Sequence, residues 1–123
     1  MIEQESKFNA DAKSSAGAIG LMQLQPTTAK GIAIRTGGSK FVLSDLYDPE
    51  INVRYGAWYL HHLMAKYADE RLALAAYNAG QQNVDEWRAS GEGIQFSETR
   101  AYVDKVERLK KIYRRAYAHE LGY

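Results

Sequence analysis

Residues 14–29 read SSAGAIGLMQLQPTTA, a run of small residues that leads through a short apolar turn into a proline. The glycines at 17 and 20 let the backbone pass close to another group, as a ligand or a packed helix requires. From Leu24 to about Ile34 the pattern predicts a short helix with Pro26 in its first turn, where the missing N–H costs nothing. The stretch therefore predicts a tight loop that feeds directly into a helix.

A carboxyl group stands upstream of this loop at an unusual place. If residues 1–9 form a helix, positions 1, 2, 5 and 8 share one face. That face carries Met1, Ile2, Glu5 and Phe8, and the opposite, solvated side carries Glu3, Gln4, Ser6 and Lys7. A carboxyl desolvated among hydrocarbon keeps its proton, which is the state that a general acid needs at neutral pH. Taken alone, the pattern favours an ordinary helix-edge glutamate with its tip in water.

Four segments, in order, change that interpretation. They are E-S-x-F at 5–8, G-A-x-G-L-M-Q at 17–23, A-Y-N-A-G at 76–80 and F-x-E-T-R-x-Y-V at 96–103. They are spread over nearly the whole chain, and the ordered set resembles the family of soluble lytic transglycosylases with the lysozyme-like fold. One of these segments would be weak evidence, whereas the ordered set is strong.

The resemblance implies an enzyme, a bacterial peptidoglycan lytic transglycosylase that cleaves the MurNAc-GlcNAc β-1,4 bond. It implies that Glu5 is the single catalytic glutamate, which protonates the glycosidic oxygen and then takes a proton from the muramic acid C6 hydroxyl. The product is a 1,6-anhydromuramic end, and the substrate's own N-acetyl group replaces a second carboxylate. The resemblance also implies these substrate-binding residues: Ser14, Gln23, Tyr77, Asn78, Glu98 and Tyr102.

Each of the better-defined assignments has a plainer alternative. Ser14 suits a turn, and Gln23 suits a polar cap on the turn that follows it. Tyr77, on an alanine-rich helix, suits a packed core, and Glu98 suits the first turn of a helix through the helix dipole. The chain also departs from the family pattern at Gln25, commonly methionine, and at Gln82, where a second glycine is usual. These departures affect fine specificity more than the acid.

Two rival functions remain open. Glycoside hydrolysis usually needs two carboxyl groups about 5 to 9.5 Å apart. A hydrolytic muramidase of the goose-lysozyme kind would need a second carboxylate to position water, and the candidates are Asp11, Asp45 and Asp48. The other rival is a non-catalytic peptidoglycan-binding or assembly module on the same scaffold. Loss of the acid would be its signature, and Glu5 is present.

The composition excludes several partners. With 16 basic and 15 acidic residues the net charge is +1, so nothing indicates nucleic-acid binding. No apolar run reaches about 18 residues, so we expect no membrane span. The adjacent His61 and His62 would point about 100° apart on a helix, so they cannot share one metal ion. We expect no metal, no cofactor and a monomer whose partner is the peptidoglycan glycan strand.

The resemblance implies a location in the cell envelope, either the periplasm or the extracellular wall. The chain shows no basic-then-apolar leader, so export would depend on a signal absent from it. We therefore expect residues 1–123 to be one catalytic domain, excised from or N-terminally truncated relative to a longer exported protein.

The remaining pattern predicts an all-helical, lysozyme-like domain with at most a trace of β-strand. Residues 36–39 break the first long helix. Asp48 caps a helix over 49–67, and Asp69 caps another over 70–79 that ends at Gly80. A short helix through Val84 and Trp87 follows, and the last helix runs over 98–118. Its mixed charges indicate a solvated face with ion pairs at i, i+4 spacing.

Overall fold

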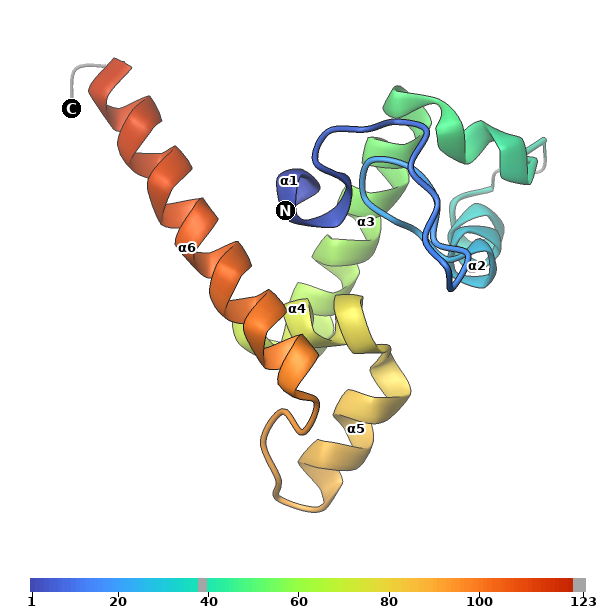
Figure 1. Ribbon diagram of the computed structural model, residues 1–123. Coiled ribbons are helices and arrows are strands. Elements are labelled where there is room, and N and C mark those ends of the chain that lie inside the picture. Colours follow the sequence, from blue (N-terminus) through green and yellow to red (C-terminus); the bar gives the residue numbers. More distant parts are fainter. Residues whose placement is uncertain (38–39, 121–123) are drawn as a thin grey trace. The chain divides into compact units, whose positions relative to one another are not determined.

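The computed structural model describes residues 1–37 and 40–120 (Figure 1). It divides into two compact units within helix α3 (Pro49–Tyr67). The N-terminal unit is Ile2–His62 and the C-terminal unit begins at Leu63. The other elements are α1 (Ile2–Ser6), α2 (Pro26–Thr36), a 3₁₀ helix (Leu43–Tyr47), α4 (Glu70–Ala79), α5 (Gln81–Ala89) and α6 (Ser97–Glu120). The all-helical prediction is confirmed. Gly38 and Ser39, part of the predicted break, lie outside the described residues.

Among the described residues, the trace of β-structure consists of two isolated bridges. Ile19 pairs with both Lys13 and Leu24, and these bridges tie together the loop that precedes α2. Within the described ranges, no helix is both long and apolar enough to cross a membrane.

The first helix is shorter than predicted. It ends at Ser6 instead of near residue 9, because Lys7 and Phe8 adopt positive φ angles of 53° and 62°. Such left-handed angles cannot continue a right-handed α-helix, so helical hydrogen bonding stops here. Phe8 leaves the helix with 61% of its surface exposed, so its place on a core-facing stripe was a wrong prediction.

The prediction that Ser6 lies on the solvated side of α1 is also wrong. Ser6 is buried, and its hydroxyl contacts the carbonyl oxygens of Ile2 at 3.2 Å and Leu21 at 2.7 Å. A buried hydroxyl needs such partners, because leaving it unpaired costs about 1 to 3 kcal/mol. Glu5 beside it is half-buried.

Helix starts and stops follow the local signals. Pro26 and Pro49 stand at the first positions of α2 and α3. Asp48 Oδ1 accepts the N–H of Glu50 at 2.9 Å, and Asp69 Oδ1 accepts the N–H of Leu72 at 3.2 Å. Gly80 ends α4 with φ 94° and ψ 149°, a region that is essentially restricted to glycine. The predicted caps at Asp48, Asp69 and Gly80 are confirmed.

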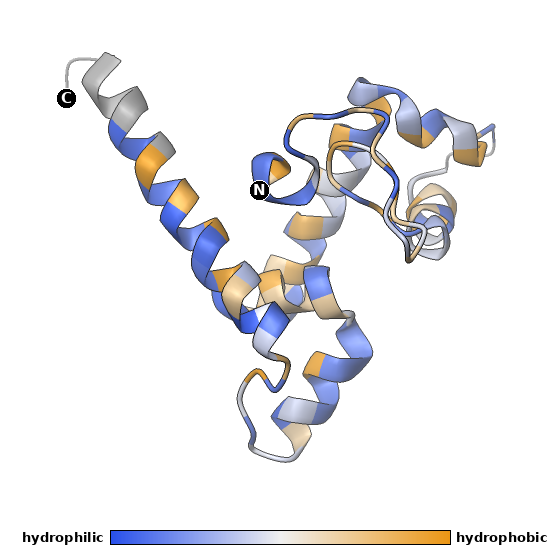
Figure 2. Cartoon of the chain, in the orientation of Figure 1, coloured by the Kyte–Doolittle hydropathy of each residue, from blue (hydrophilic) through white to orange (hydrophobic). Residues whose placement is uncertain are grey.

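The C-terminal unit packs α4 against both α5 and α6. Three alanines of α4 have no exposed surface, and their small side chains allow α5 and α6 to pack closely: Ala73, Ala75 and Ala76. Figure 2 shows hydrophobic positions recurring along an otherwise hydrophilic α6. This pattern is typical of a helix with one packed face.

The charges of this unit link different helices. Arg71 of α4 pairs with Asp104 and Glu107 of α6, and Asp104 raises the pKa of the Arg71 guanidinium. The last helix was predicted to form ion pairs within itself at i, i+4 spacing, whereas these two carboxylates pair with a residue of α4. On α5, the hydrogen bonds from Lys66 and then Tyr67 lower the pKa of Asp85. Neighbouring helices are thereby joined at their surfaces.

A glycine inside α3 supplies a test of packing in the N-terminal unit. A Cβ on Gly56 would lie 2.4 Å from Met22 Sδ and 2.8 Å from Met22 Cβ. We expect Gly56→Ala to destabilise the protein by about 1 to 3 kcal/mol through overpacking, although alanine is the better helix former. Urea unfolding measures the change.

Gly31→Ala is the matched control, because Gly31 also lies in a helix but has nothing within 4 Å of its would-be Cβ. It should stabilise the protein by up to about 1 kcal/mol. Equal stabilisation by both substitutions would mean that Met22 moves aside without cost.

Candidate functional site

The residues predicted to act on substrate fall into two sets, one in each unit. Glu5, Ser14 and Gln23 belong to the N-terminal unit. The C-terminal unit carries Tyr77, Asn78, Glu98 and Tyr102.

Glu5 is the next-to-last residue of α1, a helix of five residues. A helix this short has almost no stability of its own, because its nucleation cost is spread over few hydrogen bonds. Its order must come from tertiary contacts, and one such contact is the 2.7 Å bond from the neighbouring Ser6 hydroxyl to Leu21 O. The half-buried Glu5 side chain is thus presented by a segment that the loop holds in place.

Ser14 helps to close this loop. Its Oγ accepts the Ala18 N–H at 3.0 Å, while the two backbones pair through Ser14 N–H and Ala18 O at 2.9 Å. Ser14 therefore has the turn role that the sequence offered as the alternative to substrate binding. A hydroxyl that accepts one bond still has a proton to donate, so the turn role and a substrate contact are compatible.

Gln23 uses its side chain inside the same loop. Its Nε2 donates to Ala12 O at 3.2 Å and to Gly20 O at 2.9 Å, and its backbone has a φ of 50°. Both N–H groups of the amide are engaged. If Gln23 contacts a sugar, the contact must therefore be made by its Oε1, which can accept a hydroxyl proton.

A residue that sequence reasoning missed organises this loop from α3. Asn52 has no exposed surface, and its Nδ2 donates to Ile19 O and Leu46 O at 2.9 Å each. Its Oδ1 accepts the Met22 N–H at 2.8 Å. The available signal was an asparagine inside a helix, a position that this residue type disfavours unless its amide has partners.

In the C-terminal unit, α4 and α6 meet through side chains at their ends. Thr99 Oγ1 donates to Asn78 Oδ1 at 2.8 Å, and Thr99 is only 2% exposed. Thr99 was also missed from the sequence, although it belongs to the E-T-R segment. Asn78 is itself exposed.

The other C-terminal candidates differ in their exposure. Glu98 is exposed in the first turn of α6, where the helix dipole favours its charge. Tyr77 is half-buried on α4, and Tyr102 is only 6% exposed. Tyr102 therefore has little surface to offer a ligand.

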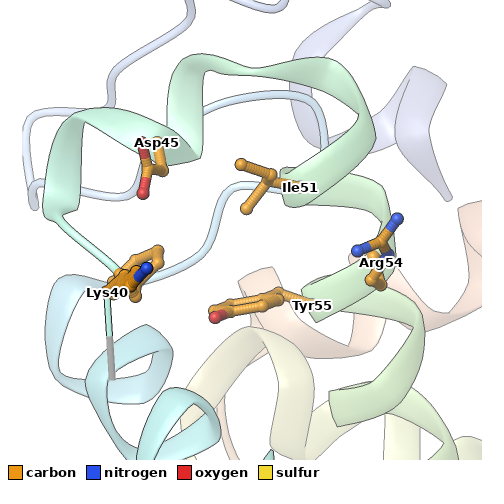
Figure 3. A pocket seen from close by; sticks show the side chains of 6 residues that line it. Lys40, Asp45, Ile51, Arg54 and Tyr55 are labelled. Atoms are coloured by element: carbon orange, nitrogen blue, oxygen red, sulfur yellow. The ribbon is translucent and has the colours of Figure 1, made fainter. Parts of the chain in front are cut away.

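One hollow of the N-terminal unit has Asp45, a candidate for the second carboxylate, in its lining. Figure 3 shows Lys40, Asp45, Ile51, Arg54 and Tyr55 arranged around it, and its volume is about 260 Å³. Phe41 completes the lining. Arg54 already pairs with Glu50 at 2.6 Å, so one of the two cations here is neutralised. None of the residues assigned to substrate by the sequence contributes to this pocket.

Comparison with known proteins gives a consistent family signal. The family model for the transglycosylase SLT domain matches residues 1–98. The chain is 37% identical over 126 residues to the soluble lytic murein transglycosylase of Escherichia coli, covering 90% of this chain and 19% of that protein. It is 35% identical to the membrane-bound lytic murein transglycosylase F of Serratia proteamaculans, covering 98% of this chain and 24% of that protein.

Solved structures agree with the sequence matches. The 70 kDa soluble lytic transglycosylase of Escherichia coli superimposes with a TM-score of 0.75 at 36% identity, over 83% of this chain and 18% of that one. An inactive glutamate-to-glutamine mutant of lytic transglycosylase Slt from Pseudomonas aeruginosa gives a TM-score of 0.72 at 38% identity, over 83% and 18%. The chain thus spans about a fifth of the length of these relatives.

Proposed function

Because this chain belongs to the transglycosylase SLT domain family, we propose that it cleaves the MurNAc-GlcNAc β-1,4 bond of peptidoglycan without adding water. Residues 1–123 act as one catalytic domain in the cell envelope, on peptidoglycan glycan strands. The observation that carries the proposal is the half-buried Glu5, presented by a five-residue helix that is bonded to the G-L-M-Q loop.

Glu5 acts twice in this mechanism. Its protonated carboxyl gives a proton to the glycosidic oxygen as the bond to the MurNAc C1 breaks. The resulting carboxylate then takes the proton of the MurNAc C6 hydroxyl, whose oxygen closes onto C1. Protons balance, Glu5 returns to its starting state, and the product is a 1,6-anhydro ring. The inactive glutamate-to-glutamine mutant of the Pseudomonas aeruginosa relative supports a requirement for one glutamate.

The hydrolytic alternative needs a second carboxylate to hold a water, and two of its three candidates already serve helix starts. Asp48 Oδ1 accepts the Glu50 N–H, and Asp45 Oδ2 accepts the Val42 N–H at 3.1 Å. Asp11 is exposed in the turn after Asn9. These roles favour the single-carboxylate mechanism.

Digestion of purified peptidoglycan tests the proposed function. The products should be muropeptides one water lighter than those of a lysozyme, with no end that borohydride reduces. Reducing MurNAc ends throughout would instead establish a muramidase. If no fragment is released while the protein still sediments with the cell wall, the chain is a binding module.

Tyr77→Phe should lower turnover while leaving stability nearly unchanged. We propose that the Tyr77 hydroxyl takes part in substrate binding, and phenylalanine keeps the ring while deleting only that hydroxyl. Tyr67→Phe is the control, because the Tyr67 hydroxyl bonds to Asp85 at 2.8 Å. That variant should lose about 1 kcal/mol of stability and keep its turnover. Wild-type turnover in Tyr77→Phe would return Tyr77 to a purely packing role.

A further inference from the structure

A single peptide unit of the loop is held from two sides by side chains. The Leu21 carbonyl accepts the Ser6 hydroxyl at 2.7 Å, and the Met22 N–H of the same peptide bond donates to Asn52 Oδ1 at 2.8 Å. The C=O and N–H of a trans peptide lie in one plane and point in opposite directions. The Leu21–Met22 peptide is therefore a rigid link between Ser6 on α1 and Asn52 on α3.

The chemistry of its three partners sets the orientation of the Asn52 amide. Met22 N–H can only donate, so an oxygen must face it, whereas the Ile19 and Leu46 carbonyls can only accept, so the NH₂ must face them. Turning the amide over would break all three bonds in a place with no exposed surface. The Asn52 amide thus has one allowed orientation, and its bond to Met22 N–H fixes the orientation of the Leu21–Met22 peptide.

The fold brings a fourth group against this amide. Gly20 packs so closely that a Cβ there would lie 2.3 Å from Asn52 Nδ2. The loop and the Asn52 side chain therefore have little room to move relative to each other. The rigidity needed to place a distant group is therefore present at the Asn52 end of the link.

We propose that Asn52 is a positioning residue for Glu5, acting through the Leu21–Met22 peptide and the Ser6 hydroxyl. The proposal rests on the function assigned to Glu5 above. Glu5 precedes Ser6 on a helix that is too short to be stable by itself. A displacement of the Leu21–Met22 peptide therefore displaces the Glu5 carboxyl as well. Displacing a reacting group by about 1 Å can lower turnover by about 10²-fold.

The test measures kcat and KM on soluble glycan strands, together with the melting temperature. The variants are Ser6→Ala, Asn52→Ala and the double variant. Positioning predicts that kcat falls by about 10-fold or more in each single variant with KM little changed. The double variant should be no slower than the slower single one, because both substitutions break the same link. Backbone amide exchange over residues 3–7 should accelerate in both single variants.

Thr36→Val is the matched control, since the Thr36 hydroxyl also bonds a backbone carbonyl of the N-terminal unit, Ile32 O at 2.8 Å. Its kcat should equal that of the wild type. Wild-type kcat in Ser6→Ala overturns the proposal, and so does a multiplicative loss in the double variant. If Asn52→Ala fails to fold, Ser6→Ala decides by the same criterion. An active Glu5→Gln variant would instead overturn the proposed function itself.

Discussion

Replacing Gly20 by alanine is expected to lower the free energy of unfolding by roughly 3 to 5 kcal/mol. Gly20 has a φ of 80°, which costs an L-residue roughly 1 to 2 kcal/mol. The new Cβ would also lie 2.5 Å from Leu46 O and 2.3 Å from Asn52 Nδ2. Because Asn52 cannot retreat without breaking buried hydrogen bonds, each of which is worth about 1 to 3 kcal/mol when left unmade, the contact adds to the backbone strain.

Gly17→Ala separates these two contributions. Gly17 lies in the same loop with a φ of 90°, but nothing stands within 4 Å of its would-be Cβ. It should lose only the backbone cost of roughly 1 to 2 kcal/mol. Equilibrium urea unfolding of both variants measures the difference. An equal loss in the two would mean that the Gly20–Asn52 approach is not tight.

Glu5→Gln is expected to reduce glycan cleavage by about 10²- to 10⁴-fold or more while the fold survives. The amide keeps the shape of the side chain but can neither give nor take the proton that the mechanism moves. The Ser6 bond to Leu21 is untouched, so the melting temperature should stay close to that of the wild type.

Glu3→Gln is the control for this variant. It makes the same chemical change two residues away on the same helix, and it should cleave at the wild-type rate. Turnover of Glu5→Gln equal to the wild type would show that Glu5 is not the acid.

The parts of the fold that sequence predicts well are those whose cause is local. Asp48 and Asp69 bond to N–H groups two or three residues ahead, so the caps of α3 and α4 can be read from neighbouring letters. Gly80 and Pro26 act through their own backbone conformation. These signals need no knowledge of the rest of the chain.

The site needed information from farther away. Helical periodicity placed Ser6 in solvent and Phe8 in the core, because it assumed that α1 continued past residue 6. The buried Ser6 hydroxyl bonds to a carbonyl oxygen 15 residues away, and the Asn52 amide bonds to backbone atoms 30 and 33 residues away. No periodicity encodes such partners. The family motifs selected Glu5 and its neighbours, but they gave no reason for the serine that follows the acid.

The central claim is that Glu5 drives cleavage with the substrate's C6 hydroxyl as the nucleophile and no water. Digestion of peptidoglycan in water enriched in oxygen-18, followed by mass analysis of the fragments, tests it most directly. In a parallel digestion, a hydrolytic lysozyme incorporates one solvent oxygen into the fragments for each bond that it cleaves. The account predicts that wild-type protein releases fragments carrying no solvent oxygen at the cleaved end. The Glu5→Gln variant should release almost no fragments. One oxygen-18 on every new MurNAc end would contradict it.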